Sequence, residues 1–202
     1  MTVETESVVI EGVEFAAALT LRSDIGLIAL HGTKEGGTAE LAHEVAARTG
    51  ASCLVFTQPA GDLVHIPSHR MAAPHCETLQ EFLASVTLVI SLHGHRRPEA
   101  PRSIFLGGGN RAAAATLAHS LVALAPAFDT VTDMARIPGG LRGLHPGNPV
   151  NLTRSGGVQI ELPLSARTRL PAKPQGAPDV PPRPVTAALA AGVGHLGARP
   201  RG

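Results

Sequence analysis

The chain has 202 residues, with 17 Lys and Arg against 16 Asp and Glu, so its formal net charge at pH 7 is +1. So small a net charge gives no basic field that would attract nucleic acid or an anionic membrane, and the absence of Trp and Tyr leaves few aromatic faces for base stacking. Two cysteines exclude a disulfide framework, and no apolar run approaches the roughly 20 residues that span a bilayer.

Two further features of the composition set the expected class and location. Apolar residues make up 44% of the chain, which is typical of a globular domain with a substantial core. Residues 1–7 contain two Glu and no Lys or Arg, so they do not resemble a secretory signal peptide. We therefore expect a cytoplasmic protein with neither nucleic acid nor membrane as a partner, and the sequence leaves its oligomeric state open.

Strands and helices alternate in the predicted order of elements. Short apolar runs predict buried strands, and apolar positions along one helical face predict helices. In chain order, the pattern predicts a strand at 25–30, a helix at 39–48, a strand at 52–57, a helix at 76–85, strands at 86–92 and 103–106, a helix at 111–125, an edge strand at 127–131 and a strand at 158–162. Thr38 and Asn110 are the predicted N-caps of two of the helices, and Gly50 is a predicted helix stop.

Alternation of this kind predicts an α/β fold with a mixed, mostly parallel sheet and helices on both faces. Residues 2–21 are ambiguous and allow a hairpin. We expect residues 1–170 to form a single catalytic domain. Residues 171–184 include six prolines and predict an extended connector, because proline supports neither a helix interior nor a sheet ladder. Residues 185–202 are expected to form a short C-terminal helix, at 186–192, and a tail.

Two of the predicted strands end in the same way, in His31-Gly32 and in His93-Gly94. The carboxyl ends of strands form the ligand crevice of an open α/β sheet, so the two histidines can converge if their strands are neighbours. Glu35 lies four residues beyond His31 in a glycine-rich segment and can offer a carboxylate to the same point. Two imidazoles, one carboxylate and an open position are the ligands of hydrolytic zinc sites. The alternative is that each histidine is an ordinary loop residue.

Five short motifs resemble the poly-γ-glutamate hydrolase family of phages and bacteria, in the same order along residues 25–170. They are HGTKEGGT at 31–38, VHIPS at 64–68, SLHG at 91–94, FLGGGNR at 105–111, and Asn151 followed by GVQIE at 157–161. The resemblance implies a fold like that of the zinc carboxypeptidases, with one Zn²⁺ held by His31, Glu35 and His93. The segment from His31 to Glu35 is one residue shorter than in the family, and Thr33 replaces a glycine, so this loop must follow a different path to the metal.

Glu161 is the candidate catalytic carboxylate. Its strand sequence, VQIEL at 158–162, alternates so that Gln159 and Glu161 share one face. Burial near the crevice would raise the pKa of this carboxyl group toward neutrality, which suits a general base. The residues alone leave open a structural ion pair with Arg167 or Arg169. The family resemblance implies that Glu161 takes a proton from the attacking water and passes it to the leaving amine.

Four residues are candidates for substrate binding. Arg111 follows three glycines at a predicted helix start, where backbone amides and the guanidinium can meet a carboxylate. Arg154 is a second candidate cation, and His65 and Ser68 belong to a motif that is expected to line the cleft. Solvated surface arginines and an ordinary loop histidine are the alternatives.

These observations together predict a zinc-dependent amidase that hydrolyses γ-glutamyl amide bonds in a small or polymeric substrate bearing carboxylates. One alternative is a metal amidase for small N-acyl amino acids or cell-wall peptides. The other is a non-catalytic binding module of the same fold, which the altered loop before Glu35 suggests.

Overall fold

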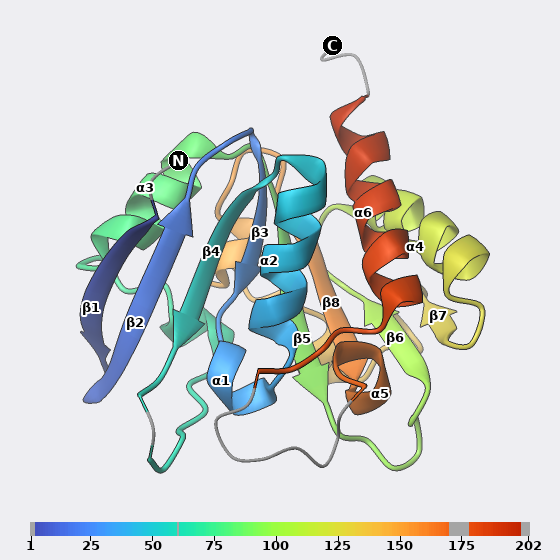
Figure 1. Ribbon diagram of the computed structural model, residues 1–202, viewed down its shortest axis with the longest axis horizontal. Helices are drawn as coiled ribbons and strands as arrows, with labels where there is room; N and C mark the ends of the chain where they lie inside the picture. Colours follow the sequence, from blue (N-terminus) through green and yellow to red (C-terminus); the bar gives the residue numbers. More distant parts are fainter. Residues whose placement is uncertain (1–2, 60, 170–177, 199–202) are drawn as a thin grey trace.

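The computed structural model describes residues 3–59, 61–169 and 178–198, which form one eight-stranded sheet with helices on both faces (Figure 1). The strands are β1 (Glu4–Ile10), β2 (Val13–Thr20), β3 (Ile25–Ala29), β4 (Ser52–Thr57), β5 (Leu88–His95), β6 (Ser103–Leu106), β7 (Asp129–Val131) and β8 (Gly157–Pro163), in the sheet order β1-β2-β4-β3-β5-β8-β6-β7. The four central strands, β4, β3, β5 and β8, are parallel. The expected mixed, mostly parallel α/β sheet is therefore confirmed.

The described residues also form six α-helices and three short 3₁₀ turns. They are α1 (Gly32–Glu35), α2 (Thr38–Thr49), η1 (Ser68–Arg70), α3 (Glu77–Ser85), α4 (Arg111–Leu124), η2 (Gly139–Leu141), η3 (Pro149–Asn151), α5 (Leu164–Arg167) and α6 (Arg183–Gly197). Helices α2, α4 and α6 bury their apolar sides against one face of the sheet. Helix α3 packs on the other face, where it contacts the edge strands β1 and β2 (Figure 1). None of the described helices is long and apolar enough to cross a membrane.

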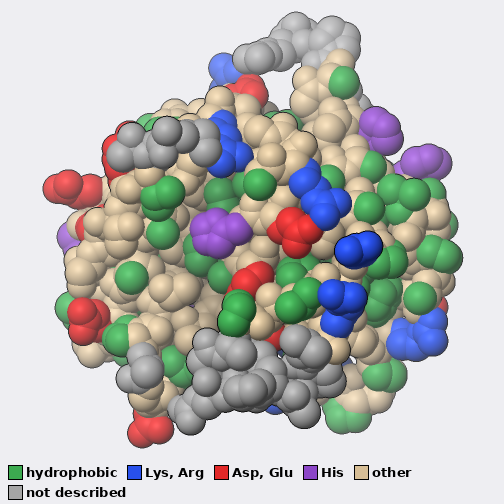
Figure 2. Space-filling view, viewed as in Figure 1, with side chains coloured by type: hydrophobic (Ala, Val, Ile, Leu, Met, Phe, Trp, Pro, Cys, Tyr) green, Lys and Arg blue, Asp and Glu red, His purple; other side chains and the backbone are tan. Residues whose placement is uncertain are grey.

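Most of the predicted elements lie where the apolar runs place them. Strands β4 and β6 match their predicted bounds, β1 and β2 form the antiparallel hairpin that residues 2–21 allow, and Gly50 ends α2 in a left-handed conformation. The Asn110 side chain caps α4 as predicted, because its Oδ1 accepts a hydrogen bond from the Ala113 N–H at 2.9 Å. Acidic, basic and histidine side chains are interspersed on the described part of the face that carries α2 and α6 (Figure 2).

Several predicted boundaries differ from the observed ones, and β7, for example, begins two residues later than the edge strand predicted at 127–131. The N-cap of α2 is Gly37, with φ 82°, and Thr38 lies inside the helix. Strand β5 begins two residues later than predicted and continues through His95, because β8 pairs with it to that point. Helix α6 is about twice as long as the predicted segment 186–192, since a proline in the first turn is compatible with a helix.

The predicted connector, residues 171–184, agrees with the structure only in its middle part. Its first seven residues lie outside the described part of the chain. Residues 178–182 have neither helix nor strand, as predicted, and Arg183 and Pro184 already belong to α6. Residues 199–202 of the predicted tail are also outside the described part.

Candidate active site

The two histidines of the repeated His-Gly motif meet at the carboxyl edge of the sheet. Strands β3 and β5 are parallel neighbours, His31 follows β3 at the start of α1, and His93 lies near the end of β5. Their Nδ1 atoms are 3.3 Å apart, and both residues are at most 3% exposed. His93 lies within β5, although the predicted strand ended just before it. Main-chain pairing with β8 therefore fixes its position.

Glu35 reaches the same point through a single turn of helix. In α1 the Glu35 N–H donates to the His31 carbonyl at 2.9 Å, which is the i to i+4 spacing that aligns the two side chains. The Glu35 Oε1 atom lies 3.2 Å from His31 Nδ1 and 3.5 Å from His93 Nδ1. Its other oxygen accepts a hydrogen bond of 2.9 Å from the Gly94 N–H. The shorter loop therefore brings this carboxylate to the histidines by coiling.

The donor set fits a tetrahedral metal ion. Zn–N and Zn–O bonds of about 2.0–2.1 Å imply ligand atoms about 3.3 Å apart. The three distances among His31 Nδ1, His93 Nδ1 and Glu35 Oε1 are 3.2, 3.3 and 3.5 Å. The three side chains thus present nitrogen and oxygen donors at the separations that such an ion requires.

Hydrogen bonds behind the rings leave the Nδ1 atoms as the donors to a metal. His31 Nε2 lies 2.7 Å from the Ile66 carbonyl, which accepts hydrogen bonds only, so Nε2 carries the proton and Nδ1 the lone pair. His93 Nε2 lies 2.8 Å from the Ser91 hydroxyl, two residues earlier on the same face of β5. Partners of this kind orient the histidine ligands of metal sites and fix their tautomers.

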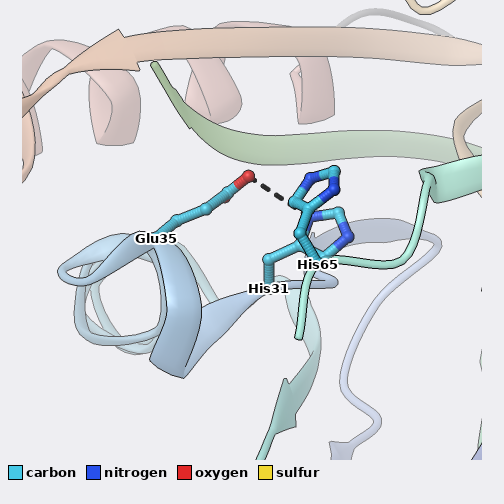
Figure 3. A group of neighbouring side chains, drawn as sticks. All are labelled: His31, Glu35 and His65. Atoms are coloured by element: carbon cyan, nitrogen blue, oxygen red, sulfur yellow. Dashed lines mark ion pairs between the residues drawn. The ribbon is translucent and has the colours of Figure 1, made fainter. Parts of the chain in front are cut away.

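His65 adds a further donor at the edge of this group. Its ring stacks on that of His31 with centroids 4.4 Å apart. One ligand atom from each of His31, Glu35 and His65 lies within 4.8 Å of the others, a grouping that can hold a metal ion (Figure 3). His65 is exposed while His93 is buried, so His93 is the more rigidly held donor and His65 lies toward solvent.

The electrostatics of the group keep Glu35 ionised. Burial alone would raise the pKa of Glu35, but His93 and His31 more than compensate and bring it to about 2. Burial lowers the pKa of His93. The negative charges of Glu35 and Glu161 raise this pKa by a larger amount, so the net shift is upward. The Glu35 carboxylate is therefore already ionised, whereas His93, whose pKa is raised, would release a proton when a metal ion binds.

Glu161 lies directly beside this group. It is the Cα partner of His93 in the ladder between β5 and β8, and it is 4% exposed. Burial raises the pKa of its carboxyl group to about 7. Among the described residues it forms no ion pair with Arg167 or Arg169, so the structural alternative that the sequence left open does not occur there.

A buried pair of amides holds Glu161. Gln159, two residues earlier on the same face of β8, donates from Nε2 to Glu161 Oε1 at 2.8 Å. Asn148 donates from Nδ2 to Gln159 Oε1, also at 2.8 Å. The second hydrogen bond fixes which end of the Gln159 amide faces Glu161, since an amide nitrogen donates and an amide oxygen accepts.

Arg167 joins the segments that carry the ligands from behind. This guanidinium is 1% exposed and donates to the carbonyls of Gly36 at 2.6 Å, Leu162 at 3.2 Å and His95 at 3.4 Å. Gly94 leaves the necessary room, because a Cβ there would lie 2.5 Å from the guanidinium carbon. The glycine after His93 therefore serves this close approach rather than a sharp turn.

Glu35, His93 and Glu161 line a pocket of about 390 Å³. Its walls are the segments 65–69 and 139–148, whose rings His69 and His145 stack with centroids 4.1 Å apart. Ser68 and His65 line the pocket, as expected for contact with a substrate. Gln159 and Asn148 line it as well.

Arg111 and Arg154 lie away from this pocket. Strand β6 is antiparallel to β8, so the glycine loop after β6 lies at the opposite edge of the sheet. The Arg111 guanidinium donates to the carbonyls of Gly108 at 3.2 Å and Thr132 at 2.6 Å. Arg154 is exposed in the turn that precedes β8, at that same opposite edge. The prediction that these arginines meet the substrate at the metal-ligand group is not supported by their positions.

Several residues of the site were not predicted from the sequence. Gln159 and Ser91 carry a local signal, since each lies two residues before a site residue on the same face of its strand. Asn148, Arg167 and the Ile66 carbonyl come from distant segments, and no local pattern marks them.

The comparisons with known proteins establish the fold and the family of the chain. No curated protein sequence matches the chain. A solved structure of a bacteriophage poly-γ-glutamate hydrolase superposes with a TM-score of 0.74 at 20% identity, covering 93% of this chain and 89% of that one. A zinc-free apo structure of YNDL superposes with a TM-score of 0.71 at 25% identity, covering 90% and 88%. The family profile described as poly-gamma-glutamate hydrolase matches residues 6–175, and the chain accordingly belongs to the poly-γ-glutamate hydrolase family.

Proposed function

We propose that this chain is a zinc-dependent amidase that cleaves γ-glutamyl amide bonds in a substrate bearing carboxylates. The observation that carries the proposal is the triangle of His31 Nδ1, His93 Nδ1 and Glu35 Oε1, two of whose residues, Glu35 and His93, line one pocket with Glu161. A triangle of this size and a neighbouring carboxyl group with a raised pKa are the two components of metal-assisted amide hydrolysis. All four residues lie within residues 1–170, the proposed catalytic domain.

His31, Glu35 and His93 would hold the zinc ion. When bound there, zinc would polarise the scissile carbonyl and make water a stronger nucleophile near neutral pH. The Ile66 carbonyl and the Ser91 hydroxyl would keep the two imidazoles oriented toward the ion. The stacked His65 ring and Ser68 would contact the substrate at the pocket entrance.

Glu161 would move the proton that the reaction requires. Hydrolysis joins the oxygen of water to the carbonyl carbon, breaks the C–N bond and leaves one proton to be delivered to nitrogen. The Glu161 carboxylate would accept that proton from the attacking water and donate it to the leaving amine. A pKa of about 7 suits both steps, since the group is then neither too weak a base nor too weak an acid at neutral pH.

Metal analysis and substrate profiling test this proposal together. Protein purified without added metal should contain about one zinc per chain, and a chelator should remove activity that zinc restores. The zinc-loaded enzyme should cleave γ-linked glutamate oligomers and leave α-linked oligomers of the same length intact. Turnover of N-acyl amino acids or cell-wall peptides alone would favour the small-substrate amidase. A chain that binds no zinc and is equally stable in chelator would be a binding module, and the proposal would be wrong.

A further inference from the structure

A second cleft lies beyond the active-site pocket along the same two strands. It has a volume of about 700 Å³ and lies between the segment that follows β5 and the segment that follows β8. Its strand-end residues, His95 and Pro163, are paired in the ladder two residues after His93 and Glu161. Since a parallel strand rises about 3.3 Å per residue, the Cα atoms of His95 and Pro163 lie about 7 Å further along the strands than those of His93 and Glu161.

The walls of this cleft combine positive charge with apolar surface. Arg96 and Arg97 follow β5, and Arg169 follows α5 on the other wall. None of the described residues that line the cleft is acidic, and the nearby Glu99 binds one of the three arginines, Arg97, at 3.0 Å. The apolar part of the lining is formed by Pro98, Pro101, Pro163 and Leu164.

This combination fits the repeating chemistry of a γ-linked glutamate chain. Each unit of such a chain carries one free carboxylate and two methylene groups between successive amides. Five backbone bonds per unit give a length of about 6 Å, by comparison with about 3.5 Å for the three bonds of an α-linked residue. One unit therefore spans the distance from the reacting groups to the cleft. Guanidinium groups pair with carboxylates in a bidentate manner, and methylenes pack on proline and leucine.

We propose that this arginine cleft, formed by residues 95–101 and 163–169, binds the part of a γ-linked glutamate chain that lies one unit beyond the scissile bond. Arg96 and Arg169 pair with the free carboxylates, and the proline surface contacts the methylenes. The cleft thereby gives the enzyme a preference for polymeric substrate over the shortest oligomers. This inference rests on the proposed function, because it places the scissile bond at Glu161.

Substrate length is the variable that isolates the cleft. Zinc-loaded parent enzyme, Arg96→Gln and Arg96→Gln/Arg169→Gln are compared on a γ-linked glutamate dimer and hexamer at low salt. The dimer, with one unit on each side of the scissile bond, ends at the edge of the cleft, whereas the hexamer extends into it. We expect the double variant to lose about tenfold in kcat/KM on the hexamer, mostly through KM, and less than about twofold on the dimer. Arg48→Gln, an exposed arginine of α2 that lines neither cavity, is the matched control and should behave like the parent.

A direct binding measurement separates this inference from the proposed function. If the parent cleaves no γ-glutamyl oligomer, the proposed function fails, and the cleft is then judged by calorimetric titration of the hexamer into parent and double variant. Binding that weakens about tenfold in the double variant supports the cleft. Equal binding by the two proteins, or no binding by the parent, overturns it. Equal losses on dimer and hexamer would also overturn it, because they would indicate a general defect.

Discussion

His93 and Glu161 face each other as register partners on the adjacent parallel strands β5 and β8, and they are 3% and 4% exposed. Main-chain hydrogen bonds in the middle of the sheet hold these two residues together, so their proximity does not depend on a loop. The proposed ligand and the proposed base therefore share one rigid framework, and each can be altered without moving the other.

Glu161→Gln should abolish proton transfer and leave the metal in place. The amide has nearly the shape of the carboxyl group but cannot accept a proton at neutral pH. We expect kcat to fall about 100-fold or more, with an unchanged zinc content by elemental analysis. Activity equal to that of the parent would show that another group is the base.

Removal of either imidazole should instead remove metal and activity together. His31→Ala or His93→Ala deletes one of the three donors and leaves two, which is too few for a stable site. The loss of zinc affinity, measured by competition with a chelator, should exceed the 10–100-fold typical of changes to outer partners. His119→Ala, an exposed histidine of α4, is the control and should bind zinc as the parent does.

Gln159→Leu should lower kcat with little change in KM. The substitution removes the hydrogen bond of 2.8 Å that orients Glu161 and leaves the Asn148 amide without its acceptor. Loss of one buried hydrogen bond costs about 1.5 kcal/mol, which corresponds to about tenfold in rate if the bond is retained in the transition state. Steady-state kinetics at saturating substrate test this, and an unchanged kcat would show that Glu161 needs no such support.

Arg167→Met should destabilise the protein without touching the pocket. It leaves the Gly36, Leu162 and His95 carbonyls without their donor in a buried position. We expect the free energy of unfolding to fall by about 3 kcal/mol or more in denaturant titrations. Arg169→Met, on an exposed neighbour, should stay within about 0.5 kcal/mol of the parent.

The metal-free protein should lose stability through Glu161 as pH rises. Burial raises the pKa of Glu161 from 4.5 to about 7 in the folded state, so folding favours its neutral form. The resulting stabilisation is complete below pH 4.5 and is lost as pH rises through 7. Relative to Glu161→Gln, the parent should therefore lose about 3 kcal/mol in unfolding free energy between pH 4.5 and pH 8. Parallel pH profiles for the two proteins would contradict the buried, raised-pKa description.

Local sequence patterns predicted the parts of the site that lie on regular elements. The repeated His-Gly ending indicated that His31 and His93 would converge, and alternation in β8 indicated that Glu161 and Gln159 share a face. The structure brings Glu35 to the same point by the turn of helix in α1, which no local sequence pattern indicated.

What the sequence did not predict depends on long-range pairing. Nothing in residues 103–106 indicates whether the strand runs parallel or antiparallel to its neighbour, and that direction alone moves Arg111 to the far edge. Arg167 is buried because three backbone carbonyls from separate segments converge on it. The burial of Arg167 therefore depends on the complete fold, and the residues next to it in the sequence do not indicate it.

The stacked rings of His69 and His145 line the pocket on segments separate from those that carry Glu35, His93 and Glu161. The proposed reacting groups belong to central strands and to the turn beside them, whereas the entrance is built from two surface segments that these rings join. Specificity can therefore diverge faster than chemistry in this scaffold. For protein engineering, these two positions are where a wider opening would admit branched or chemically capped polymers while the hydrolytic centre stays intact.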